Sequence, residues 1–204
     1  MLFRASSFGL PLTLNGIGLA AVSQLDRVFV GSWFGVRELG LYAVMFSMSV
    51  VPTNLLIGVF SGPSFSFLLA NREDADSRGQ RYQLLLAFYS VLAGLYACWI
   101  AVTLDVLTPL IFGPAFAVST TAHILFILIA CFRLQRSGAP TANLLASGRT
   151  KQLAVLNLSA GCGLLFAFVF VTVRPSLEAM LPGIVIGEFA SLTFCLLTQG
   201  KAVR

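Results

Sequence analysis

The fold is decided by the stretch from Ile124 to Lys151, which reads ILFILIACFRLQRSGAPTANLLASGRTK. It starts as an apolar membrane helix, yet Arg133 and Arg136 appear before the apolar run has ended. An arginine at membrane depth costs roughly 2.5–3.5 kcal/mol on insertion scales, so it usually faces a bundle interior or a watery cavity. Helical i+3/i+4 spacing groups the polar side chains of this stretch on one face, made of Arg133, Arg136, Pro140, Asn143 and Ser147. This face predicts a transport pathway or a site for an anion.

The rest of the stretch is apolar. On a helix, the side opposite the two arginines is expected to meet lipid, and its residues are Cys131, Leu134, Ala142 and Leu145. Gly138, Ala139 and Pro140 predict a break in the middle.

The composition of the whole chain is that of an integral membrane protein. Its 204 residues are 57% hydrophobic and 10% charged, with a mean hydropathy of +0.90, whereas soluble domains carry about 25% charged residues. Because about 20 apolar residues cross a bilayer, we expect an all-α, six-helix polytopic bundle that forms one transmembrane domain over 1–204. The predicted spans are 8–33, 40–70, 82–104, 117–147, 152–173 and 178–199.

Two details of these spans are also predicted. The second span is expected to be kinked or broken because it contains Pro52, Gly58, Gly62 and Pro63. The third is expected to end near Leu104, because Pro109, Gly113 and Pro114 follow. The polar segment 71–81 reads as a solvated loop between the second and third spans.

The basic residues predict an orientation, since cytoplasmic loops of membrane proteins are enriched in Lys and Arg. With six spans, both termini lie on one side together with Arg4, Arg72, Arg78, Arg81, Arg149, Lys151, Lys201 and Arg204. The other side holds only Arg37 and Arg174. This bias predicts cytoplasmic termini, and it accounts for the net charge of +5 without a nucleic-acid partner.

Catalytic and metal sites are not expected. The four cysteines lie singly in apolar segments, without CxxC or metal-ligand spacing. The one histidine, His123, has no carboxylate or cysteine near it in the sequence. We therefore predict no enzyme activity, no metal and no cofactor.

Four further polar positions lie within the spans. Asn15, Asp26 and Arg27 belong to the first span, and Glu188 lies in the middle of the sixth. Acidic residues at membrane depth often couple transport to protons or sodium, so Glu188 and Asp26 are the candidates for ion coupling. The simpler alternatives are an ion pair or helix-end anchor at Asp26–Arg27, and a buried hydrogen bond or arginine pair at Glu188.

Several motifs appear in an order that resembles one known family. The run FGLPLTLNGIGLAAVSQLDRVFVGSWFGVRELGLYAV covers 8–44, and it is followed later by PLIFG at 109–113 and LASGRTK at 145–151. Together they resemble the C-terminal lobe of bacterial polysaccharide (O-antigen or exopolysaccharide) flippases. Those proteins belong to the multidrug/oligosaccharidyl-lipid/polysaccharide exporter superfamily.

The resemblance implies a function and a location. Such flippases have two six-helix lobes around a central cavity and move an undecaprenyl-pyrophosphate-linked oligosaccharide across the bacterial cytoplasmic (inner) membrane by alternating access. This chain resembles one lobe only. A second six-helix lobe, from another copy or a separate chain, is therefore an expected partner, and a fragment, a broken reading frame and a half-transporter all remain open.

The resemblance also suggests roles for the polar residues. Arginine forks suit phosphate oxygens, so the predicted substrate-binding residues are Arg133, Arg136, Arg27, Asn143 and Asn15. The predicted hinges are Pro52, Gly58, Gly138 and Pro140. The alternative for Arg133 and Arg136 is snorkelling to the cytoplasmic interface, although Arg136 lies roughly 16 Å of helix from the following polar turn. The alternative functions are a small-molecule or drug exporter of the same superfamily and a non-transporting scaffold of a polysaccharide assembly complex.

The predicted orientation can be tested by a fusion. A reporter enzyme joined after Arg174 is expected to be active on the outside of the cytoplasmic membrane, because Arg174 lies on the side that is poor in basic residues. A reporter at this position that proved cytoplasmic would contradict the assignment.

Overall fold

The computed structural model describes residues 13, 16, 24–70, 75–117 and 119–200, and these residues contain helices and no strands. Residues 24–34 are helical and lead into the long helices α2 (Val36–Leu69) and α3 (Ala75–Val102). A π-helix, η1 (Thr103–Leu107), joins α3 to α4 (Thr108–Phe112), and a 3-10 turn, η2 (Pro114–Phe116), follows. The remaining helices are α5 (Thr120–Ser137), α6 (Ala139–Ala146), α7 (Thr150–Val173) and α8 (Leu177–Gly200).

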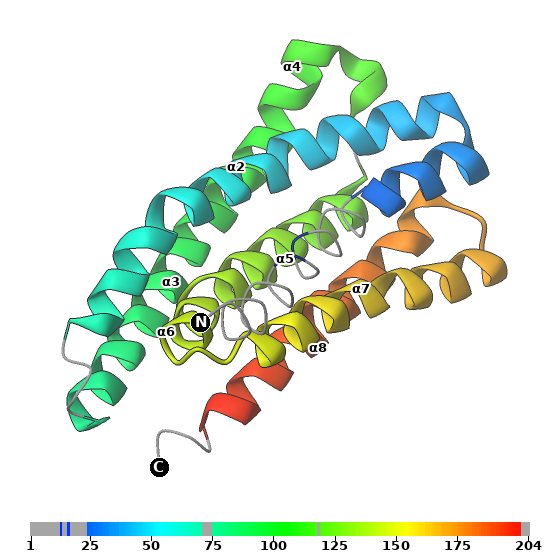
Figure 1. Cartoon of the computed structure of the whole chain (residues 1–204). Helices are drawn as coiled ribbons and strands as arrows, with labels where there is room; N and C mark the ends of the chain where they lie inside the picture. The colour runs from blue at the N-terminus through cyan, green and yellow to red at the C-terminus, as the bar shows by residue number, and fades with distance from the viewer. Residues whose placement is uncertain (1–12, 14–15, 17–23, 71–74, 118, 201–204) are drawn as a thin grey trace.

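Helix α5 is the centre of the arrangement. It packs against α3 and α2 on one side and α8 on another, while α7 packs mainly against α8 (Figure 1). Its first turn is capped by Ser119, whose hydroxyl accepts a hydrogen bond from the backbone N–H of Ala122 at 3.2 Å. The stretch that carries the two arginines is thus covered by other helices.

The prediction of an all-helical, multi-pass chain is confirmed. Four helical segments of the described chain are long and apolar enough to cross a membrane, namely Val36–Leu69, Ser77–Phe112, Thr150–Val173 and Leu177–Gln199. Helix α5 is not among them, and it carries His123, Arg133, Gln135 and Arg136. Six spans and cytoplasmic termini remain predictions, and most of the predicted first span lies outside the described residues.

The predicted break in the second span is absent, because helix α2 continues through both Pro52 and Pro63. Helix α3 ends at Val102, near the end predicted at Leu104, but the chain stays helical through η1 and α4 as far as Phe112. Pro109 is tolerated because it stands in the first turn of α4, where a missing N–H costs little. The helix ends at Gly113, whose φ of 92° suits glycine.

The polar segment 71–81 was also predicted wrongly in part. Its second half is helical, because α3 begins at Ala75. The predicted fourth span, 117–147, is two helices that meet at Gly138, so the break expected from Gly138–Pro140 is present. The last two predicted spans differ from α7 and α8 by at most two residues at either end.

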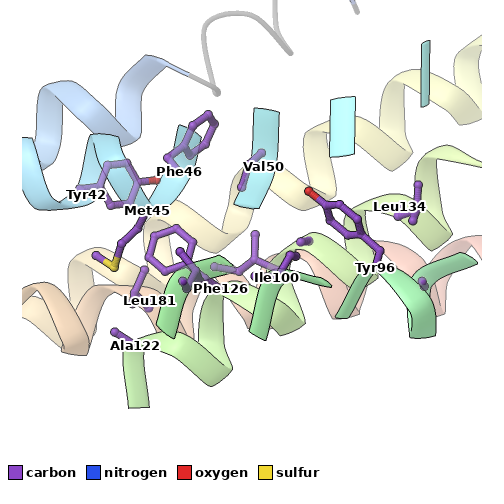
Figure 2. Packing of buried hydrophobic residues seen from close by; sticks show 14 of the residues in the cluster. Tyr42, Met45, Phe46, Val50, Tyr96, Ile100, Ala122, Phe126, Leu134 and Leu181 are labelled. Carbon is purple, nitrogen blue, oxygen red and sulfur yellow. The ribbon is translucent and has the colours of Figure 1, made fainter. Parts of the chain in front are cut away.

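The buried apolar core lies where α2, α3, α5 and α8 meet. Figure 2 shows Tyr42, Phe126, Ile100 and Leu181, one from each of these helices, converging in this core. Leu134 and Ala142 are buried as well, so the prediction that their side of the stretch meets lipid is wrong for these two residues. The physical reason is that neighbouring helices flank both α5, which carries Leu134, and α6, which carries Ala142.

Helices α7 and α8 approach each other through glycine. A Cβ added at Gly183 would lie 2.2 Å from the backbone N of Ala167, and one at Gly187 would lie 2.5 Å from the Cα of Gly163. Gly183 and Gly187 form a GxxxG pattern, which typically allows two membrane helices to pack backbone to backbone. The pattern is visible in the sequence as GIVIG at 183–187.

The close approach predicts the effect of a single methyl group. The variant Gly187→Ala is expected to lose about 1–3 kcal/mol of unfolding free energy, since backbone atoms of α7 must shift to admit it. The matched control is Gly94→Ala in α3, where an added Cβ meets nothing within 4 Å and alanine favours the helix. Unfolding followed by circular dichroism in detergent measures both changes, and equal stability of the two variants would contradict this packing.

Candidate anion site between α5 and α8

Arg133 and Arg136 of α5 share one carboxylate, that of Glu188 in α8. Arg133 donates to Glu188 Oε1 through Nε, and its Nη2 lies at 2.8 Å from the same oxygen. Arg136 donates through Nε to the other oxygen, Oε2, at 2.9 Å. The contact unites the three residues that were predicted separately as two substrate ligands and one coupling group. It has the geometry of the arginine pair that was left open as the alternative for Glu188.

A fourth side chain completes this cluster, which we call the Arg–Glu cluster (Arg133, Arg136, Asn157 and Glu188). Arg136 donates through Nη1 to Oδ1 of Asn157 in α7 at 2.5 Å. The cluster therefore links α5, α7 and α8 through polar contacts. The glycine contact between α7 and α8 lies directly beside it, because Gly187 precedes Glu188 in the chain. Asn157 was not predicted as a site residue, although it is one of the few polar residues of α7.

The cluster is largely buried, but one of its side chains is partly exposed to solvent. The side chains of Arg136 and Glu188 are each 3% exposed, whereas that of Arg133 is 19% exposed. Two guanidinium groups and one carboxylate leave a formal charge of +1 at this point. Burial of a charge costs free energy unless the charge is paired and hydrogen-bonded. An anion that bound beside the excess positive charge would therefore be strongly stabilised. Arg133 is the arginine of the cluster that an anion from solvent can reach.

Asp26 and Arg27 lie next to this cluster, because the charge of Asp26 interacts with that of Arg133, and as an oppositely charged pair they leave its formal charge unchanged. The Asp26 carboxylate accepts hydrogen bonds from the Tyr42 hydroxyl at 2.5 Å and from the backbone N–H of Arg27 at 2.7 Å. The Arg27 guanidinium lies over the Phe46 ring, 4.7 Å from its centroid, and its Nε is buried without a hydrogen-bond partner. In the part of the chain that the structure describes, no hydrogen bond or ion pair joins Arg27 to the Arg–Glu cluster. Asn15 lies outside that part.

Asn143 belongs to a second polar cluster near the end of the bundle. It donates to Gln199 Oε1 at 3.0 Å and accepts from Arg78 at 2.9 Å. Gln199 also donates to the Pro140 carbonyl, and Arg78 also donates to the Ser147 hydroxyl. The short helix α6 is thus fastened to α3 and α8. Sequence reasoning missed Arg78, which it placed in a loop, and Gln199, whose position at the end of an apolar helix was the only signal.

The predicted hinges lie in two different settings. Pro52 and Gly58 are inside the continuous helix α2, and a Cβ at Gly58 would meet nothing within 4 Å. Gly138 separates α5 from α6, and a Cβ there would lie 2.4 Å from Cδ1 of Tyr89. Tyr89 is fully buried and forms a 3.0 Å hydrogen bond with Ser64. Glycine at 138 is therefore required by the close approach of an aromatic ring.

Two features at the other end of α5 lie apart from the predicted site. His123 is not isolated, as the sequence suggested, because its Nδ1 lies 4.0 Å from Oδ1 of Asp105 in η1. A pocket of about 500 Å³ opens between α2, α5 and α8 and includes Glu38 and Glu178 in its wall. Of the predicted site residues that the structure describes, none lines this pocket.

Comparison with known proteins concerns mainly the first half of the chain. The sequence profile of a family described as "polysaccharide biosynthesis protein" matches residues 2–121, which is more than half of the chain. The match ends before Arg133, so the Arg–Glu cluster lies beyond it. No curated protein and no solved structure shows a significant match. The chain belongs to the polysaccharide biosynthesis protein family.

Proposed function

We propose that this chain is one lobe of a transporter that moves a lipid-linked oligosaccharide, the precursor of a polysaccharide, across the bacterial cytoplasmic membrane. The family match supports a role in polysaccharide synthesis or transport. The observation that carries the proposal is the Arg–Glu cluster, a net positive site among helices of which several are long and apolar enough to cross a membrane.

The chemistry of the cluster favours an anionic cargo. The diphosphate of a polyprenyl-linked sugar presents several oxygens close together, and a guanidinium fork binds such oxygens in pairs. A cationic drug would instead be repelled by the formal charge of +1. The proposal therefore assigns Arg133 and Arg136 to the diphosphate and prefers the oligosaccharide to a cationic small molecule.

Other residues receive supporting roles in this proposal. Arg27 and Asn15 would extend the polar path along the first span, and Asn143 would continue it beyond Gly138. Glu188 and Asp26 are the candidates for proton or sodium coupling, because both are carboxylates within the helical bundle. Movement between inward- and outward-open states would use the breaks at Gly138 and Pro140, with Pro52 and Gly58 as further points of bending.

The chain alone would provide one wall of the transport cavity. Alternating access requires a second wall that rocks against the first, and a second six-helix lobe is the partner that we propose for it. The proposed work is transport rather than catalysis, and no cofactor is invoked.

A cellular experiment tests this function. The double variant Arg133→Ala/Arg136→Ala is expected to abolish surface polysaccharide in cells that depend on the chain, while the protein remains in the membrane. Arg174→Ala, which removes an exposed arginine at the end of α7, is the matched control and is expected to leave the polysaccharide unchanged. Surface polysaccharide is measured together with the amount of each variant in the membrane fraction. Normal polysaccharide in the double variant would reject the proposal.

A further inference from the structure

We propose that Glu188 is a built-in competitor for the transported anion: its carboxylate occupies the place of the phosphate oxygens when the site is empty. This inference rests on the proposed function, because it concerns the same site. It adds a specific consequence, namely that the affinity of the site for a diphosphate is held down by a residue of the protein itself.

The first argument is the geometry of the pairing. Both oxygens of Glu188 are engaged, Oε1 by Arg133 through Nε and Nη2, and Oε2 by Arg136 through Nε. A two-atom contact of a guanidinium with one oxyanion is also the way in which arginine binds phosphate. The donors that a diphosphate requires are therefore already directed at one anionic point, and they are occupied by a carboxylate.

The second argument is the difference in burial within the cluster. Arg133 is 19% exposed along its side chain, while Arg136 and Glu188 are each 3% exposed. Arg136 has a further acceptor, Asn157, that holds its guanidinium in place. An incoming anion therefore meets Arg133 first, and it replaces Glu188 there before it reaches Arg136.

The third argument is electrostatic. An anion bound to both arginines while Glu188 stays ionised would place two negative groups side by side in a buried site. Like charges in such a position repel each other strongly, so Glu188 opposes the binding of an anion as long as its charge remains. A neutral side chain of the same shape removes that opposition, and its single amide oxygen still accepts a hydrogen bond from one of the two arginines.

The experiment uses the purified full chain in nanodiscs of zwitterionic phosphatidylcholine, so that no anionic lipid competes. The probe is inorganic pyrophosphate, which carries the diphosphate without sugar or lipid, and binding is measured by isothermal titration calorimetry. Glu188→Gln is expected to bind pyrophosphate about tenfold or more tightly than the unaltered chain, a change of about 1.4 kcal/mol or more. Adding Arg133→Ala to Glu188→Gln is expected to remove that gain.

Two further variants keep the test decisive. Glu178→Gln removes an exposed carboxylate in the first turn of the same helix and is expected to leave the affinity unchanged. Glu188→Asp keeps the charge but shortens the side chain by one methylene, which weakens its hold on both arginines together. It is expected to bind more tightly than the unaltered chain and less tightly than Glu188→Gln. If Glu188→Gln fails to fold, as judged by circular dichroism and size-exclusion chromatography, Glu188→Asp alone must show the tighter binding.

The outcomes separate this inference from the function on which it rests. If Glu188→Gln, or Glu188→Asp in its place, binds pyrophosphate no more tightly than the unaltered chain, Glu188 is only a structural ion pair and the inference is overturned, even where the arginines prove essential for surface polysaccharide. In a second outcome, the affinity for pyrophosphate rises as expected but cells with the double arginine variant make normal polysaccharide. Competition by Glu188 at an anion site is then supported, and the transport proposal is rejected.

Discussion

Two arginines share a single buried carboxylate in the interior of this bundle, and the arrangement of the second half of the chain depends on that contact. An unpaired arginine or glutamate within an apolar bundle is far more costly than one in water. The pairing of Arg133 and Arg136 with Glu188 therefore fixes the rotation of α5 relative to α8. Asn157 extends the constraint to α7, and the close glycine contact holds α7 against α8 at the same level.

The same contact connects stability with the proposed activity. Apolar residues that pack well often stabilise a folded protein as much as a buried ion pair does. A contribution to stability is therefore a weak explanation for the presence of this cluster. An excess of one positive charge, partly open at Arg133, is also more than a purely structural ion pair requires. A site that binds a diphosphate does require cationic donors, and an internal anion such as Glu188 would favour release of the diphosphate.

Much of this could be predicted from the sequence, and the exceptions have physical causes. Hydropathy alone located α7 and α8 to within two residues, and the cost of charge in a membrane drew attention to Arg133, Arg136 and Glu188. An arginine pair at Glu188 was one of the alternatives, but the sequence could not decide between them, because the pairing depends on which faces of two distant helices meet. The prolines of α2 were predicted to break the helix, but the helix continues through both of them. Whether a proline breaks a helix depends on the surrounding structure as well as on the proline itself.

Other errors arose from treating positions as independent. Asn143 was grouped with the arginines by helical spacing, but its side-chain hydrogen bonds join Arg78 and Gln199 and do not join Arg133 or Arg136. Leu134 and Ala142 were expected to meet lipid, yet they are buried in a stretch that several helices flank. Periodicity describes one helix in isolation, and the neighbours that cover it are set by tertiary packing.

If Glu188 and the two arginines form one energetically coupled unit, a double-mutant cycle will measure the coupling free energy. The free energy of unfolding in detergent is compared for Glu188→Met, Arg136→Met and the two combined. Glu188→Met alone is predicted to lose about 3–5 kcal/mol, because it leaves two buried cations without their anion. Adding Arg136→Met is predicted to recover part of that loss. Losses that simply add, or a negligible effect of Glu188→Met, would contradict the account.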